Sequence, residues 1–166
     1  MNEPHDMSTE LWLEDANVAI QAIRRAGAHN LLLVPGNAWT GGHSWTHDWY
    51  GTPNAEVMLG IADSLDNYAY EIHQYLDSDY SGTSPECITA AEASEKLIDF
   101  TNWAKENGKR AFLGLDNSPL INSLLISKVT TKKNTAINAS LIQCKTVRFN
   151  PKFFVPNNIC VFKILK

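Results

Sequence analysis

An unbroken apolar run, Leu31–Val34, lies between Asn30 and Pro35. A strand with one face in solvent alternates apolar and polar residues, so this run predicts a strand that is buried on both faces. An amphipathic helix is predicted before it, over residues 12–26, because apolar side chains recur three and four positions apart and Gly27 follows at the usual C-terminal position. A doubly buried strand that follows a helix is typical of an α/β fold.

The same alternation continues along the chain. Two further strands are predicted, over residues 68–75 and 110–115, with a helix over residues 90–107 between them. Helices that join successive strands through short links favour a parallel sheet. The connection over residues 35–68 is longer than a plain link and is rich in Gly, Trp and His, which indicates a functional loop.

Charge is distributed unevenly over the 166 residues. Residues 1–118 hold all 18 acidic and 6 of the 14 basic residues, a formal charge of −12, whereas residues 119–166 hold the other 8 basic residues, a charge of +8. A basic segment usually indicates a nucleic-acid or membrane-surface partner. Here Lys and Arg are scattered without helical spacing, so we predict neither partner. We interpret this segment as out-of-frame or intron-derived sequence, with a genuine basic arm as the alternative.

Neither a membrane span nor a cofactor is predicted. No apolar run reaches the ~18 residues that a membrane-spanning helix needs, and the polar, acidic start of the chain predicts no signal peptide. Cys87, Cys144 and Cys160 lack the spacing of metal ligands, and they could form one disulfide without requiring it. His43 and His47 are four positions apart, but the flanking Gly and Trp disfavour a helix and no third ligand is evident, so no metal site is predicted.

Three motifs carry the most specific information. Asn2-Glu3-Pro4-His5 stands near the start, Pro35-Gly36-Asn37-Ala38-Trp39-Thr40-Gly41 follows the first predicted strand, and residues 71–83 read EIHQYLDSDYSGT. In order and approximate spacing, these motifs resemble glycoside hydrolase family 5, in particular the fungal-type endo-β-1,4-glucanases, or cellulases. The resemblance runs from Asn2 to about Gly114.

The resemblance implies a TIM (β/α)8 barrel. Such a barrel usually needs ~250 residues, so 166 residues predict a partial barrel that covers about strands four to seven, with strands one to three upstream of Met1. The Asn-Glu-Pro segment would end strand four. We therefore divide the chain into a partial catalytic domain, residues 1–115, and a non-homologous basic tail, residues 116–166, that is mistranslated or disordered.

The resemblance also implies the chemistry of the site. Retaining glycosidases use one carboxyl group as acid/base and a second as nucleophile. Glu3 aligns with the acid/base, and Asn2 with the residue that binds the sugar 2-hydroxyl. His73 and Tyr75 are two apart on a predicted strand and therefore share a face; the family places the His against sugar hydroxyls and the Tyr hydroxyl against the nucleophile.

Aromatic side chains in the long connection suit sugar recognition, because their faces stack on the C–H faces of glucosyl rings. Trp39 is the first of them, with Trp45 and Trp49 nearby. Three Trp residues in eleven positions of a polar loop are poorly explained as core. Trp39, His43 and Trp45 are therefore predicted to bind the substrate.

The nucleophile is the main departure from the family pattern. The third predicted strand delivers Leu115 where family members carry the nucleophilic Glu, and Asp116 would point to the opposite face. Leu cannot form a glycosyl ester, so we predict that the chain is inactive alone. In the family, Cys87 would have a disulfide partner in a segment that this sequence lacks.

The predicted function is hydrolysis of O-glycosyl bonds in cellulose or a related β-glucan, polymeric or oligomeric, by ancestry. One alternative is a mannan or β-1,3-glucan hydrolase of the same superfamily, because subsite loops rather than catalytic residues choose the sugar. Another is a non-catalytic carbohydrate-binding remnant that uses Trp39, Trp45 and His73. The parent enzyme is expected to be secreted.

Overall fold

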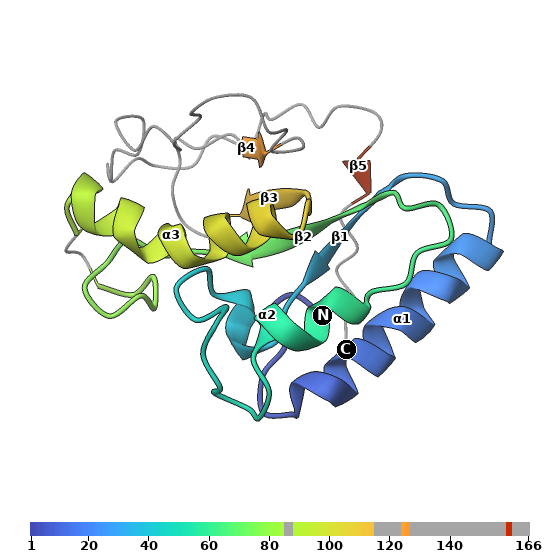
Figure 1. Cartoon of the computed structure of the whole chain (residues 1–166), viewed down its shortest axis with the longest axis horizontal. Helices are drawn as coiled ribbons and strands as arrows, with labels where there is room; N and C mark the ends of the chain where they lie inside the picture. Colours follow the sequence, from blue (N-terminus) through green and yellow to red (C-terminus); the bar gives the residue numbers. More distant parts are fainter. Residues whose placement is uncertain (85–87, 115–123, 127–158, 161–166) are drawn as a thin grey trace.

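The computed structural model describes residues 1–84, 88–114, 124–126 and 159–160 (Figure 1). Within these ranges the chain alternates helices and strands. The elements, in chain order, are α1 (Thr9–Arg25), β1 (Leu31–Pro35), the 3-10 turn η1 (Ala38–Thr40), α2 (Asn54–Val57), η2 (Met58–Gly60), β2 (Tyr68–His73), α3 (Ala90–Glu106), β3 (Ala111–Gly114), β4 (Leu124–Ile126) and β5 (Ile159–Cys160).

The strands form one sheet in the order β4-β3-β2-β1-β5. β1, β2 and β3 are parallel neighbours, β5 pairs parallel with β1, and β4 pairs antiparallel with β3. His73 is paired with Gly114, so β2 and β3 end at the same edge of the sheet. The predicted α/β class with a parallel sheet is confirmed for β1–β3.

Side-chain caps define where the two long helices begin. In α1, the Ser8 hydroxyl accepts a hydrogen bond from the Leu11 amide at 3.2 Å, so the helix starts before the predicted residue 12. In α3, Thr89 and Glu92 form a reciprocal capping box. The Trp12 indole donates to the Pro35 carbonyl at 2.8 Å, which fixes α1 against the end of β1.

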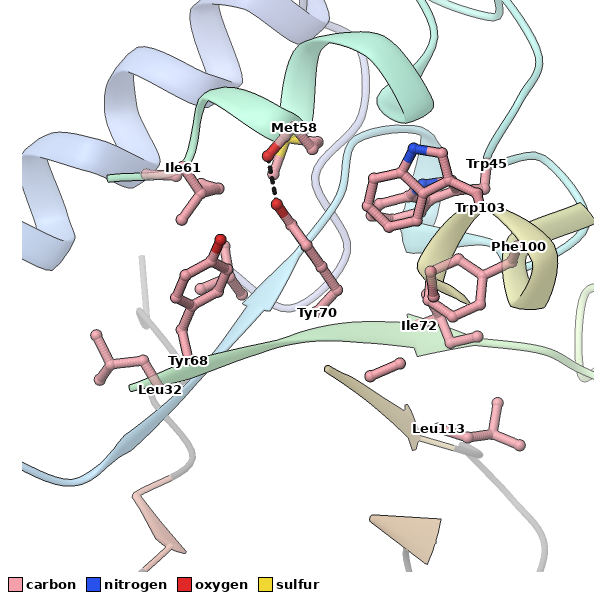
Figure 2. Packing of buried hydrophobic residues seen from close by; sticks show 14 of the residues in the cluster. Leu32, Trp45, Met58, Ile61, Tyr68, Tyr70, Ile72, Phe100, Trp103 and Leu113 are labelled. Atoms are coloured by element: carbon pink, nitrogen blue, oxygen red, sulfur yellow. Dashed lines mark hydrogen bonds between the residues drawn. The ribbon is translucent and has the colours of Figure 1, made fainter. Parts of the chain in front are cut away.

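The main core lies between the sheet and the three helices. Trp45 is its centre, with ring centroids 5.1 Å from those of Phe100 and Trp103 and 5.6 Å from that of Tyr70 (Figure 2). The Tyr70 hydroxyl donates a short hydrogen bond to the Met58 carbonyl, drawn as a dashed line in Figure 2. Strand and helix side chains therefore interlock through aromatic contacts as well as apolar burial.

The opposite face of the sheet is also buried. Leu33, Ala69 and Phe112 form a second, smaller cluster there, against which Leu31 packs. Leu32, beside Leu33 on β1, belongs to the main core. The prediction that β1 is buried on both faces is therefore confirmed.

Two expected strand boundaries differ from the structure. β2 ends at His73, so Gln74 and Tyr75 follow the strand instead of belonging to it. Residues 1–8 contain no strand, although the end of strand four was expected there, and β5 occupies the place beside β1. The three residues before Pro4 are too few to form a paired strand of ordinary length.

Other expectations lie outside the described residues. Leu115, Asp116, Cys87 and Cys144 are among them, as is the tail over 116–166 apart from β4 and β5. In the part of the chain that is described, no helix is both long and apolar enough to cross a bilayer.

Candidate active site

The carboxyl ends of the parallel strands open on a cleft of about 430 Å³, a volume typical of small-ligand sites. Side chains from the N-terminal segment, the long connection after β1 and the loop after β2 meet there. The lining residues are Glu3, Ala38, Trp39, Gly41, His43, Ser44, Trp49, His73, Tyr75, Asp79, Tyr80 and Ser81.

Glu3 is the carboxyl group that the other catalytic candidates in the cleft contact. His73 Nδ1 lies 2.7 Å from Glu3 Oε1, and the Tyr75 hydroxyl donates to the same oxygen at 3.5 Å. The His73 side chain is only 4% exposed, whereas that of Glu3 is 25% exposed and accessible from the cleft. The structure thus brings together three of the predicted catalytic residues.

The surroundings of His73 favour its charged form. Burial alone lowers the pKa of this imidazole, but the carboxylates of Glu71 and Glu3 outweigh burial, and the net pKa is raised above its ordinary value. An imidazolium at this position donates from both ring nitrogens. Protonated His73 can therefore donate a hydrogen bond from Nδ1 to Glu3.

A strained turn presents Trp39 to the cleft. Ala38, Trp39 and Thr40 have φ values of 52°, 55° and 53°, a conformation that costs a non-glycine residue about 1–3 kcal/mol. Thr40 compensates through its hydroxyl, which donates to the Glu71 carbonyl and accepts from the Gly36 amide at 2.8 Å. Three consecutive residues in this conformation indicate a turn whose shape serves the site.

Two buried asparagines hold this turn. The Asn37 amide donates to Asn54 Oδ1 at 2.8 Å, and Asn54 Nδ2 donates back to the Asn37 carbonyl at 2.9 Å. Asn37 Nδ2 also donates to the Met7 carbonyl at 2.8 Å, and the Trp39 amide donates to the Pro4 carbonyl at 2.9 Å. The N-terminal segment that carries Glu3 and the turn that carries Trp39 are thus positioned together.

An exposed aromatic group borders the cleft around Trp39. Its ring is stacked on His5, with centroids 5.0 Å apart and an angle of 14°, and meets Trp49 edge-on at 5.9 Å. The ring centroid of Tyr50 lies 5.9 Å from that of Trp39. His5 covers one face of Trp39, but Trp39 is still 38% exposed and Trp49 is 55% exposed, so both rings keep surface available to a flat apolar ligand such as a sugar ring.

His43 lies on another wall of the cleft. Its backbone amide donates to Gln74 Oε1 at 3.0 Å, its Nδ1 lies 3.2 Å from the same oxygen, and its ring is 4.8 Å from that of Tyr80. Burial lowers the pKa of His43, and nearby His47 and Lys96 add to that effect. Neutral His43 is therefore suited to hydrogen bonding with ligand hydroxyls.

The family follows from these motifs together with their placement. Residues 1–115 match the family described as cellulase, glycosyl hydrolase family 5. The chain belongs to glycoside hydrolase family 5. The family's barrel architecture agrees with the parallel strands and flanking helices observed here.

Individual relatives of this family 5 chain are endoglucanases. Endoglucanase 1 of Robillarda sp. (strain Y-20) is 41% identical over 163 residues, 96% of this chain and 40% of the relative. Endo-β-1,4-glucanase B of Aspergillus niger is 41% identical over 113 residues, 68% of this chain and 32% of the relative. The alignment with the Robillarda enzyme therefore extends past residue 115.

Among solved structures, that of XacCel5A in complex with cellopentaose has a TM-score of 0.66 and 48% sequence identity. The match covers 72% of this chain and 39% of the XacCel5A chain. The family 5 chain described here thus spans between 32% and 40% of the length of these three relatives.

One predicted substrate residue lies elsewhere. Trp45 is 0% exposed at the centre of the main core and is not among the residues that line the cleft, so it cannot stack on a sugar (Figure 2). The prediction that Trp45 binds the substrate is therefore wrong. The high Trp content of this loop suggested sugar binding, but the loop folds back onto α3 and places Trp45 in the core. Trp39 and His43 do line the cleft, whereas Asn2 does not.

Several cleft residues had no role assigned from the sequence. Asp79, Tyr80 and Ser81 lie in the loop after β2, inside a motif that was recognised, but the motif alone does not show which side chains face the cleft. Among the described residues, no three His, Cys, Asp or Glu side chains are grouped as metal ligands would be.

Proposed function

We propose that the cleft binds a β-1,4-linked glucan and that Glu3 is the acid/base of a retaining glycoside hydrolase. The convergence of Glu3, His73 and Tyr75 at the bottom of an aromatic cleft carries this proposal. The endoglucanase relatives and the cellopentaose-bound neighbour support the choice of sugar.

The proposed chemistry of Glu3 follows from its position. A protonated carboxyl group there would protonate the departing glycosidic oxygen, and the resulting carboxylate would then activate water. The contact with His73 keeps one carboxyl oxygen in a fixed direction. Positioning matters because a general acid must lie within hydrogen-bond reach of the oxygen that it protonates.

We also propose how the strands correspond to a family barrel: β1, β2 and β3 are strands five, six and seven. The helices contact one face of the sheet, while Leu33, Ala69 and Phe112 lie on the other, as outer helices and inward side chains do in a TIM barrel. Glu71 and His73 follow Ala69 at intervals of two, so they lie on the inward face. Glu3 would then follow strand four.

The boundary of the catalytic part is proposed at residue 115. The family match ends there, and acidic residues cease soon afterwards. Because β-glucan polymers are too large to enter cells, we further propose that the parent enzyme acts outside the cell.

Binding without hydrolysis is the second candidate function. The expected nucleophile position holds Leu115, and the aromatic group around Trp39 is suited to binding irrespective of catalysis. Cello-oligosaccharide binding is therefore expected in both cases, and turnover separates the two functions.

Turnover by the chain itself is expected to be undetectable. Hydrolysis of carboxymethyl-cellulose by the purified chain should not exceed that of a Glu3→Gln variant, because loss of one catalytic carboxylate typically costs several orders of magnitude in rate. The release of reducing sugar ends measures the rate of hydrolysis. Turnover that disappears in Glu3→Gln would show that a nucleophile other than residue 115 operates.

Cellopentaose binding tests the cleft itself. Replacement of Trp39 by Ala is expected to weaken binding at least about tenfold, ~1.4 kcal/mol, because an exposed stacking face is lost. Calorimetric titration measures the affinity. Leu59→Ala, at an exposed residue outside the cleft lining, is the control and should bind normally. Equal affinity of Trp39→Ala and the unchanged chain would place sugar binding elsewhere, and tighter binding of mannopentaose or laminaripentaose would indicate a different β-glycan.

A further inference from the structure

The imidazole of His73 lies between two carboxylates, of which the family resemblance assigned a role to only one. Nδ1 is 2.7 Å from Glu3 Oε1, and Nε2 is 3.5 Å from Glu71 Oε1. The second distance is long for a hydrogen bond but within the range of an ion pair. The Glu71 side chain is 14% exposed, so water screens the pair only weakly.

Gly114 in β3 leaves space for the His73 ring and the Glu71 carboxylate. Gly114 is paired with His73 across the sheet. A Cβ atom at Gly114 would lie 3.0 Å from His73 Cδ2, 3.2 Å from its Nε2 and 3.4 Å from Glu71 Oε1. A side chain here would press on the ring and on the carboxylate at the same time, so the backbone of β3 is part of the pocket that seats the pair.

We propose that Glu71 is a positioning residue of the acid/base centre, whose carboxylate holds the His73 ring so that Nδ1 donates to Glu3. The role of Glu71 in catalysis rests on the proposed function. Glu71 does not line the cleft and acts through His73. Its place two residues before His73 on β2 puts both side chains on the inward face of the strand.

The charged groups around His73 determine the expected titration. Among the described residues, Glu3 faces it from the N-terminal segment and Glu71 from β2, the Tyr75 hydroxyl faces Glu3, and the Met1 amine interacts with Glu71. Burial lowers the pKa of His73, and the two carboxylates raise it. Removing the charge of Glu71 therefore lowers the pKa and frees the ring to turn.

The experiment is an NMR titration of the histidine ring protons in the full chain, with His73 assigned from its absence in His73→Asn. The His73 midpoint is expected to fall by about one pH unit in Glu71→Gln, the size of effect that one adjacent charge has on a buried group. Glu71→Asp keeps the charge but shortens the side chain by one methylene, and a smaller fall is expected. Glu56→Gln removes the same charge from an exposed site and should leave the midpoint unchanged.

Two outcomes overturn the inference. The first is a His73 midpoint in Glu71→Gln that equals the midpoint in Glu56→Gln. The second is an unchanged His73 midpoint in folded Glu71→Asp, and it decides the matter if Glu71→Gln does not fold. The titration uses no substrate, so it is independent of sugar binding. Loss of the proposed function would appear as absent cellopentaose binding with the midpoint shift intact, whereas failure of this inference would leave binding intact and the midpoint unmoved.

Discussion

Replacement of Glu3 by Ala is expected to abolish cellulose cleavage by a chimaeric enzyme that joins residues 2–114 to the other strands of a family 5 barrel and carries Leu115→Glu. In such an enzyme both carboxyl groups lie at the carboxyl ends of the strands, where TIM-barrel enzymes have their active sites. A fall in kcat/KM of at least about a thousandfold is expected, because a leaving sugar alkoxide needs a proton.

The leaving group distinguishes an acid/base from a structural role. Activated aryl cellobiosides release a weakly basic phenolate and need little proton assistance, so Glu3→Ala should retain a much larger share of their first step. Burst kinetics measure that step separately from hydrolysis of the glycosyl-enzyme. Equal loss on cellulose and on aryl glycosides would remove Glu3 from the acid/base role.

The stereochemistry of the first product is a second criterion. With Glu at position 115 as nucleophile, double displacement should release the sugar with retained anomeric configuration, which proton NMR detects directly. Release of the inverted anomer would contradict the assignment. Glu56→Ala is the matched control and should retain full activity, because Glu56 is exposed and does not line the cleft.

The sequence predicted the elements whose signals are local. The apolar run Leu31–Val34 and the apolar spacing in residues 12–26 and 90–107 are confirmed as β1, α1 and α3, with boundaries that differ by a few residues. The side-chain caps Ser8 and Thr89 decide two of those boundaries, and a cap depends on one hydrogen bond rather than on periodicity.

Trp45 shows what local signals cannot decide. It stands in a polar loop, and nothing in its neighbours indicates that the loop folds back onto Phe100 and Trp103. The Trp45 ring also packs closely against Gly36, where a Cβ atom would lie 2.5 Å from the ring. A close contact between residues nine positions apart in an irregular loop depends on the tertiary fold, which no periodic pattern encodes.

The lining of the cleft was predictable in part, since Trp45 and Asn2 do not belong to it, and its contacts were not predictable. The period of a strand placed His73 and Tyr75 on one face, yet β2 ends at His73 and both side chains reach Glu3. The left-handed turn at Trp39 and its clamp by Asn54 were not predicted, because non-glycine residues adopt such φ values only when tertiary contacts impose them.

Loss of Arg24 is expected to destabilise the folded chain by about 3–5 kcal/mol, the usual cost of leaving one partner of a buried ion pair without the other. Arg24 Nε lies 2.7 Å from Asp63 Oδ1 and its Nη2 lies 2.8 Å from Oδ2, with 6% and 0% of the two side chains exposed. The guanidinium also donates to the Asn30 and Asn67 carbonyls, so it joins the end of α1 to the segments before β1 and β2. Urea unfolding of Arg24→Ala measures the loss. Arg25→Ala, at the exposed neighbour on the same helix, is the control and should lie within about 0.5 kcal/mol of the unchanged chain.

The pH dependence of that difference identifies its electrostatic origin. The Arg24 guanidinium lowers the pKa of Asp63 to about 2, with hydrogen bonds from the Asn67 and Leu65 amides acting in the same direction. A carboxyl whose folded pKa lies below its unfolded value of ~3.9 stabilises the fold above that unfolded pKa, and the contribution declines as pH falls toward the folded value. The free energies of unfolding of the unchanged chain and Arg24→Ala should therefore differ most above about pH 5 and approach each other toward pH 2. A difference that stays constant over this range would mean that lost packing of the Arg24 side chain, rather than the charge on Asp63, accounts for the destabilisation.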